Sequence, residues 1–128
     1  MVWTNRILLV TGALIAFVLS LAVLFAPAAF YAGYGITVGG DIALLNEMKA
    51  PAGAILLAAL VMAVGLINPA WLGSALLVGA LLYLGFGLGR VIALTSDGIP
   101  PASLLAAMAV ELLLGLGFSQ ALWRQSPR

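Results

Sequence analysis

Four long apolar stretches run through this chain, and they constrain its fold more than any other feature. We assign them to residues 6–26, 46–67, 70–94 and 101–123. A membrane-spanning helix needs about 20 apolar residues, within a range of about 17 to 25. Inside a bilayer, only helices and closed barrels satisfy their backbone polar groups internally. The sequence therefore predicts an all-α fold, in which residues 1–128 form a single transmembrane domain, an integral membrane four-helix bundle.

The composition agrees with a membrane protein and excludes several functional classes. The chain is 65% hydrophobic and 7% charged, whereas soluble domains average about 25% charged residues. A net charge of +1 leaves no broad basic surface for nucleic acid. The chain has no Cys and no His, which removes thiolate metal centres, His-ligated haem, Cys nucleophiles and His general bases. We identify no catalytic residue and expect no metal and no cofactor.

The first apolar stretch has a second interpretation, as a cleaved signal peptide. Ala26, Pro27 and Ala28 loosely resemble a small-residue cleavage site. The apolar run is longer than the usual hydrophobic region of about 7 to 15 residues, and the segment before it holds a single arginine, Arg6. We therefore favour a retained first span.

Turn signals predict an antiparallel order for the four helices. Asn68 and Pro69 separate the second and third stretches, so these two helices should form a tight hairpin. Residues 95–101 contain Asp, Gly and two Pro, which are typical of a turn between the third and fourth stretches.

The connection between the first two helices is longer and should be partly ordered at the membrane surface. It covers residues 27–49 and holds three aromatic residues, Phe30, Tyr31 and Tyr34, which are typical of the interfacial belt. Asp41 is a suitable N-cap for a short interfacial helix over residues 42–45.

The distribution of arginines predicts the orientation. Arg6, Arg124 and Arg128 lie near the two chain ends, and an even number of spans puts both ends on one side. Cytoplasmic loops carry the excess of Lys and Arg. We therefore expect both termini in the cytoplasm and residues 27–49 and 95–101 on the opposite side.

Small residues recur at helical spacing and predict close helix–helix packing. Such stripes let helix backbones approach each other in lipid. The packing positions that we predict are Gly12, Ala16, Ser20, Ala54, Ala58, Gly85, Gly89, Ala107 and Gly115. They pack the bundle in one interpretation, and in the other the run from Gly85 to Gly89 forms the face of a homodimer.

Glu111 lies in the middle of the fourth apolar stretch, where a carboxylate needs a basic or hydrogen-bonding partner. An acid at a helix centre costs roughly 2.5 to 3.5 kcal/mol on insertion scales. Arg90, which lies near the same side of the bundle in the antiparallel order, should pair with Glu111 or Glu47. The sequence thus predicts a polar cluster in the half of the bundle away from the termini, consisting of Asn46, Glu47, Lys49, Arg90 and Glu111. A structural charge network and a functional site are equally consistent with it.

The most distinctive string is LLNEMKAPAG, from Leu44 to Gly53, preceded by PAAFY at residues 27–31 and followed by Arg90 and Glu111. Together these segments resemble a family of small bacterial four-span membrane proteins, the domain of unknown function 4345. The resemblance covers nearly the whole chain, although Lys49 stands where we would more often expect Arg. It implies a four-helix integral membrane fold and implies no activity. We expect the protein in the bacterial inner membrane.

Three functions are compatible with these residues. The first is a non-enzymatic accessory or assembly subunit, whose partners are the lipid bilayer and either another membrane protein or a second copy of the chain. The second is a lipid- or quinone-handling enzyme, with Glu111 or Glu47 as acid or base and Tyr83 and Trp71 lining an apolar pocket.

The third is a small oligomeric proton-coupled transporter that uses Glu111. Small multidrug exporters of similar size carry their essential acid in the first helix, whereas here the acid lies in the fourth. We favour the accessory subunit, because the chain lacks a recognisable catalytic constellation.

Overall fold

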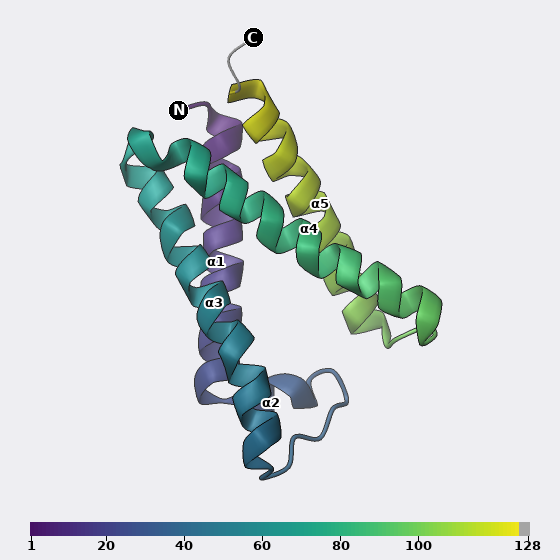
Figure 1. The fold of residues 1–128 in the computed structure, drawn as a ribbon. Helices are drawn as coiled ribbons and strands as arrows, with labels where there is room; N and C mark the ends of the chain where they lie inside the picture. The colour runs from purple at the N-terminus through teal and green to yellow at the C-terminus, as the bar shows by residue number, and fades with distance from the viewer. Residues whose placement is uncertain (126–128) are drawn as a thin grey trace.

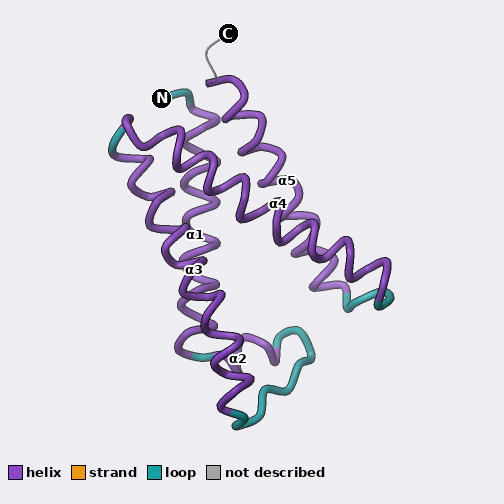
Figure 2. Tube along the Cα trace, viewed as in Figure 1, coloured by secondary structure: helices purple, strands orange, loops and turns teal. Residues whose placement is uncertain are grey.

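Four long helices form the protein in a computed structural model that describes residues 1–125 (Figure 1). They are α1 (Trp3–Phe25), α3 (Ile42–Ile67), α4 (Leu72–Ser96) and α5 (Ala102–Gln125), joined in part by the short α2 (Pro27–Ala32) and the 3-10 helix η1 (Pro69–Trp71). Each of the four is long and apolar enough to cross a membrane, and the span that contains α4 begins with η1. Over residues 1–125 there is no strand (Figure 2). The fold is therefore an all-α membrane bundle, as predicted.

The helices are arranged as two antiparallel pairs. α1 packs along α3, α4 packs along α5, and the pairs meet mainly where α3 turns into α4. The N-terminus and the last described turn of α5 lie at one end of the bundle (Figure 1). Toward the opposite end, the α4–α5 pair diverges from the α1–α3 pair (Figure 1). Arg128, one of the residues used to predict the orientation, lies outside the described residues.

The Asp41 side chain caps α3, but the helix it starts is long rather than short. Its carboxylate accepts hydrogen bonds from the backbone N–H groups of Ala43 and Leu44, at 2.9 and 3.4 Å. The expected short helix over residues 42–45 is instead the first turn of α3, which continues to Ile67. Pro51 lies inside this helix. Because proline has no N–H, the carbonyl of Glu47 has no helical donor at that point.

The segment between α1 and α3 is ordered. Pro27 ends α1 and opens α2, where its fixed backbone suits the first helical position. Gly35 has a φ of +75° and closes the turn after α2. The ring of Phe30 makes edge contacts with Tyr31 and Tyr34, with centroid distances of 5.1 and 5.3 Å. These three rings form a small aromatic cluster in the segment between α1 and α3.

One phenylalanine joins three of the four long helices. Phe118 of α5 is fully buried between Gly12 of α1 and Gly79 of α4. A Cβ atom added at Gly12 or at Gly79 would lie 2.7 or 2.6 Å from the Phe118 ring. Tyr83 stacks on the same ring at 6.0 Å and donates a hydrogen bond to the Gly12 carbonyl. The two glycines therefore make the space that the ring fills.

The predicted packing residues fall into two groups. Inside the bundle, Gly12, Ala16, Ser20 and Gly115 are buried, and Ala58 and Ala107 are half-buried. On the outer surface, Ala54, Gly85 and Gly89 are exposed. A Cβ atom at Gly85 or Gly89 would have no neighbour within 4 Å. Four glycines outside the predicted set make close contacts instead: Gly65 with Ala75, Gly79 with Phe118, Gly87 with Leu112 and Gly117 with Leu8.

Two glycine substitutions in α4 test the role of the Phe118 contact. Gly79→Ala should destabilise the bundle by about 1 to 3 kcal/mol, because the new methyl group overpacks against a rigid ring. Gly85→Ala is the matched control, and it should be neutral or stabilising by up to about 1 kcal/mol because alanine is the better helix former. Both changes raise helix propensity equally, so their difference in unfolding free energy in detergent measures the clash. Equal effects would contradict this account.

Candidate functional site

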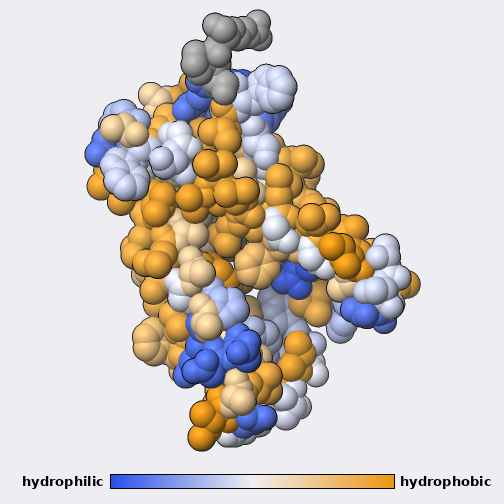
Figure 3. Space-filling view, viewed as in Figure 1, coloured by the Kyte–Doolittle hydropathy of each residue, from blue (hydrophilic) through white to orange (hydrophobic). Residues whose placement is uncertain are grey.

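A large cavity lies in the wedge between the two helix pairs. Its volume is about 680 Å³, within the range of about 300 to 1,000 Å³ that is usual for ligand sites. It is lined by residues from all four long helices, from α2 and from the segment after α2. Figure 3 shows a hollow between the pairs, bordered by hydrophobic residues and by a hydrophilic group on the wall formed by α4 and α5, with another hydrophilic group over the lower part of α3. The cavity is therefore apolar over most of its wall and polar at particular points.

Arg90 and Glu111 form an ion pair on one wall of this cavity. Arg90 Nε donates to Glu111 Oε2 at 2.7 Å, and Arg90 Nη2 donates to Oε1 at 3.1 Å. Both carboxylate oxygens are thus engaged, which is the strong, oriented form of this interaction. The pair links α4 to α5 and gives Glu111 the partner that its apolar surroundings require.

The Arg90 guanidinium keeps unused hydrogen-bond capacity. It carries five N–H donors, and within residues 1–125 it donates only the two bonds to Glu111. Its side chain is 30% exposed, against 11% for Glu111. Arg90 also lines a second cavity of about 250 Å³ at the turn between α4 and α5. The guanidinium therefore lies at the boundary between the two cavities, with donors available to a ligand.

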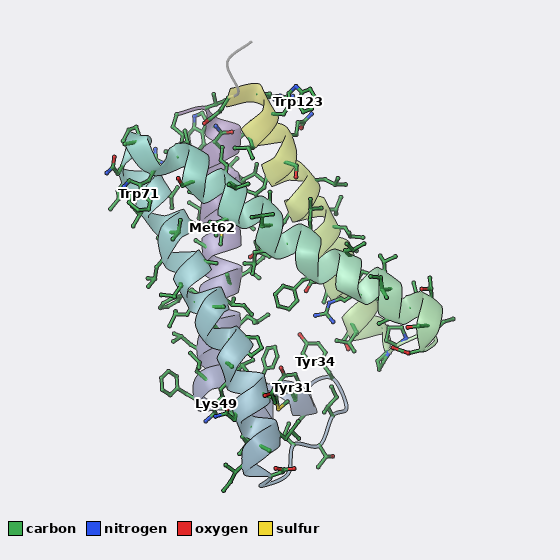
Figure 4. The ribbon with its side chains drawn as sticks, viewed as in Figure 1. Tyr31, Tyr34, Lys49, Met62, Trp71 and Trp123 are labelled. Atoms are coloured by element: carbon green, nitrogen blue, oxygen red, sulfur yellow. The ribbon has the colours of Figure 1, made fainter. Side chains whose placement is uncertain are left out.

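The other members of the predicted polar cluster lie on α3 and differ in position. All three are exposed, and of them only Glu47 lines the large cavity, whereas Asn46 and Lys49 do not. Residues two apart lie on nearly opposite sides of a helix, and Figure 4 shows Lys49 on the side of α3 away from α4 and α5. Among residues 1–125 no basic group pairs with Glu47. The structure thus brings together Arg90 and Glu111 and leaves Glu47 alone across the cavity.

Aromatic rings form two parts of the cavity wall. Phe30, Tyr31 and Tyr34 come from the α2 segment, and Tyr83 and Phe86 come from α4. Figure 4 shows Tyr31 and Tyr34 at the open end of the wedge. The sequence indicated an interfacial role for Phe30, Tyr31 and Tyr34. Their part in a cavity wall depends on the tertiary structure, because the rest of that wall comes from the four long helices. Trp71 lies at the opposite end of the bundle (Figure 4) and outside this lining.

This arrangement suits a molecule with one polar and one apolar end. Within residues 1–125, no group of three or more His, Cys, Asp or Glu side chains could hold a metal ion. The cavity wall offers a guanidinium, a free carboxylate and aromatic rings, which are groups that orient a polar head. The remaining wall is apolar and suits a hydrocarbon portion.

The ion pair yields a stability prediction that depends on which partner is removed. Breaking a buried pair costs roughly 3 to 5 kcal/mol, and we expect Arg90→Leu to reach the lower part of that range. Glu111→Leu should cost less, because the Arg90 side chain that it leaves unpaired is the more exposed of the two. The double substitution with two leucines should recover much of the loss. Thermal unfolding of the three variants in detergent checks this, and additive losses would show that the two charges are not coupled.

Comparison with known proteins places the chain in a family. No curated protein and no solved structure matches it. The family model described as Domain of unknown function (DUF4345) matches residues 4–121, a range that contains the ion pair and every residue lining the large cavity. Because this match covers nearly the whole chain, the protein belongs to the DUF4345 family.

Proposed function

We propose that this protein binds one amphiphilic molecule from the membrane in the cavity between its two helix pairs. The observation that carries the proposal is a cavity of about 680 Å³ with an apolar wall and isolated polar groups. The ligand belongs to the same broad class, lipids and quinones, as the substrate of the enzyme considered from the sequence, but we propose binding alone and no catalytic step.

The two ends of the cavity wall suit the two ends of an amphiphile. Aliphatic side chains from three helices, including Ile15, Ile55 and Leu82, suit a hydrocarbon portion. Arg90, Glu47 and the tyrosines suit a polar head. The cavity lies between the helix pairs, which diverge toward α2 (Figure 1), and we propose that a molecule dissolved in the bilayer enters there.

Proton-coupled transport through Glu111 gains no support from this geometry. Both carboxylate oxygens of Glu111 accept hydrogen bonds from Arg90. A proton carrier must exchange its proton with each side in turn, and a carboxylate held at both oxygens is poorly suited to that exchange.

The accessory-subunit hypothesis is a second candidate, favoured by the outer face of α4. Gly85 and Gly89 lie one turn apart, are exposed, and have no neighbour that a Cβ atom would meet. Such a pair of small residues permits close approach of a helix from another membrane protein. This face is separate from the cavity, so the two roles are compatible.

Filling the cavity tests the binding proposal. Ala107→Phe places a ring at a cavity-lining position of α5, and Ala109→Phe adds the same ring at an exposed position that does not line the cavity. After gentle purification, native mass spectrometry should find a bound small amphiphile on the wild type and on Ala109→Phe, and at least tenfold less on Ala107→Phe.

The same measurement separates the two candidates. An equal load of amphiphile on both variants would contradict the cavity as the site. A defined protein partner without a bound small molecule would favour the accessory subunit over the binding protein.

We also propose that the protein lies in the bacterial inner membrane with both termini in the cytoplasm. Three basic residues, Arg6, Arg124 and Arg128, lie near the two ends of the sequence, and two, Lys49 and Arg90, lie in the parts of α3 and α4 toward the opposite end of the bundle. Cytoplasmic segments are enriched in Lys and Arg. Reporter fusions at Asp97 and after the C-terminus should therefore report opposite sides, and identical signals would contradict the orientation.

A further inference from the structure

The charge on the cavity wall points to the sign of the ligand. The lining contains two carboxylates, Glu47 and Glu111, and one guanidinium, Arg90. Because Arg90 and Glu111 bind each other through both oxygens, their charges largely cancel. Glu47 remains as the uncompensated charge on the wall, so the cavity carries a formal excess of one negative charge.

An anionic head would meet an unfavourable site. Arg90 keeps free N–H donors, but an anion that accepted from them would lie near the Glu111 carboxylate bound to the same guanidinium and would share the cavity with Glu47. Like charges repel each other, so both carboxylates lower the affinity of the cavity for an anion. The wall therefore disfavours an anion and favours a cation.

The aromatic residues of the same cavity suit a cation as well. Phe30, Tyr31 and Tyr34 of the α2 segment line the cavity together with Glu47 of α3. The Phe30 ring makes edge contacts with Tyr31 and Tyr34, at centroid distances of 5.1 and 5.3 Å. Ring faces attract ammonium groups, and cages of aromatic rings are a common means of recognising quaternary ammonium ligands.

We infer that the amphiphile is a hydrophobic organic cation, whose positive end lies between Glu47 and the aromatic cluster of Phe30, Tyr31 and Tyr34. This inference rests on the proposed binding function and adds the chemical class of the ligand. The apolar portion of the cation then lies against the aliphatic wall, and the Arg90–Glu111 pair stays closed.

A pair of probes with the same shape and opposite charge tests the inference. Tetraphenylphosphonium and tetraphenylborate differ mainly in sign, and equilibrium dialysis against protein in dodecylmaltoside measures the binding of each above empty micelles. We expect saturable binding of the phosphonium probe to the wild type. Glu47→Gln should weaken it by about tenfold, and Tyr34→Leu should weaken it severalfold.

Two controls isolate the site from general charge effects. Asp41→Asn removes a carboxylate from the same end of the protein, outside the cavity lining, and should leave binding unchanged. Ala107→Phe should abolish it. Each variant is first required to unfold at the wild-type temperature, and Tyr34→Leu serves as an independent test if Glu47→Gln does not fold.

The outcomes distinguish the two levels of the proposal. If both probes bind the wild type equally and Glu47→Gln changes neither, the cationic ligand is wrong while the cavity remains a binding site. If neither probe binds and no amphiphile accompanies the purified protein, both the cationic ligand and the proposed binding function are wrong.

Discussion

The insertion of Phe118 between Gly12 and Gly79 is the contact on which the rest of the structure depends. In lipid, helices gain little from hiding apolar surface, so close packing and interhelical hydrogen bonds hold them together. Here one ring fills the space left by two glycines, and Tyr83 adds a stacking contact and a hydrogen bond to the Gly12 carbonyl. This contact holds α1, α4 and α5 together at the same position along the bundle axis. Beyond it, toward α2, the two helix pairs diverge and leave the cavity.

The same face of α4 then carries the polar wall of the cavity. Tyr83 lies one turn beyond Gly79, and Arg90 lies about two further turns along the helix. Packing at Gly79 therefore sets the direction in which Arg90 points, toward Glu111 of α5. The ion pair serves a structural purpose, because it joins α4 to α5 and compensates a carboxylate within an apolar helix. It also decides the electrostatics of the cavity, since it neutralises Arg90 and leaves Glu47 as the charge that a ligand meets.

The two proposed roles, ligand binding and partner docking, would use different surfaces of this small protein. The cavity lies between the helix pairs, whereas Gly85 and Gly89 face outward from α4. A substitution that blocks one surface leaves the other intact, so the two roles are experimentally separable. The ordered α2 segment belongs to the first role, because its aromatic rings contribute to the cavity wall.

The sequence by itself determined the number of spans, the turns, the cap at Asp41 and the need of Glu111 for a basic partner. These features depend on the length of each apolar run, on residues with restricted backbones, and on the high cost of an unpaired charge in lipid.

Only the tertiary structure decided that Arg90 pairs with Glu111 rather than Glu47. It also decided that Gly79 faces inward while Gly85 faces outward, and that the aromatic residues of the α2 segment line a cavity. The physical reason is that the lipid-facing surface of these helices is as apolar as their interior, so hydrophobic pattern does not mark the buried face. That face depends on how the helices cross, which is set by contacts between residues far apart in the sequence, such as Gly12, Gly79 and Phe118.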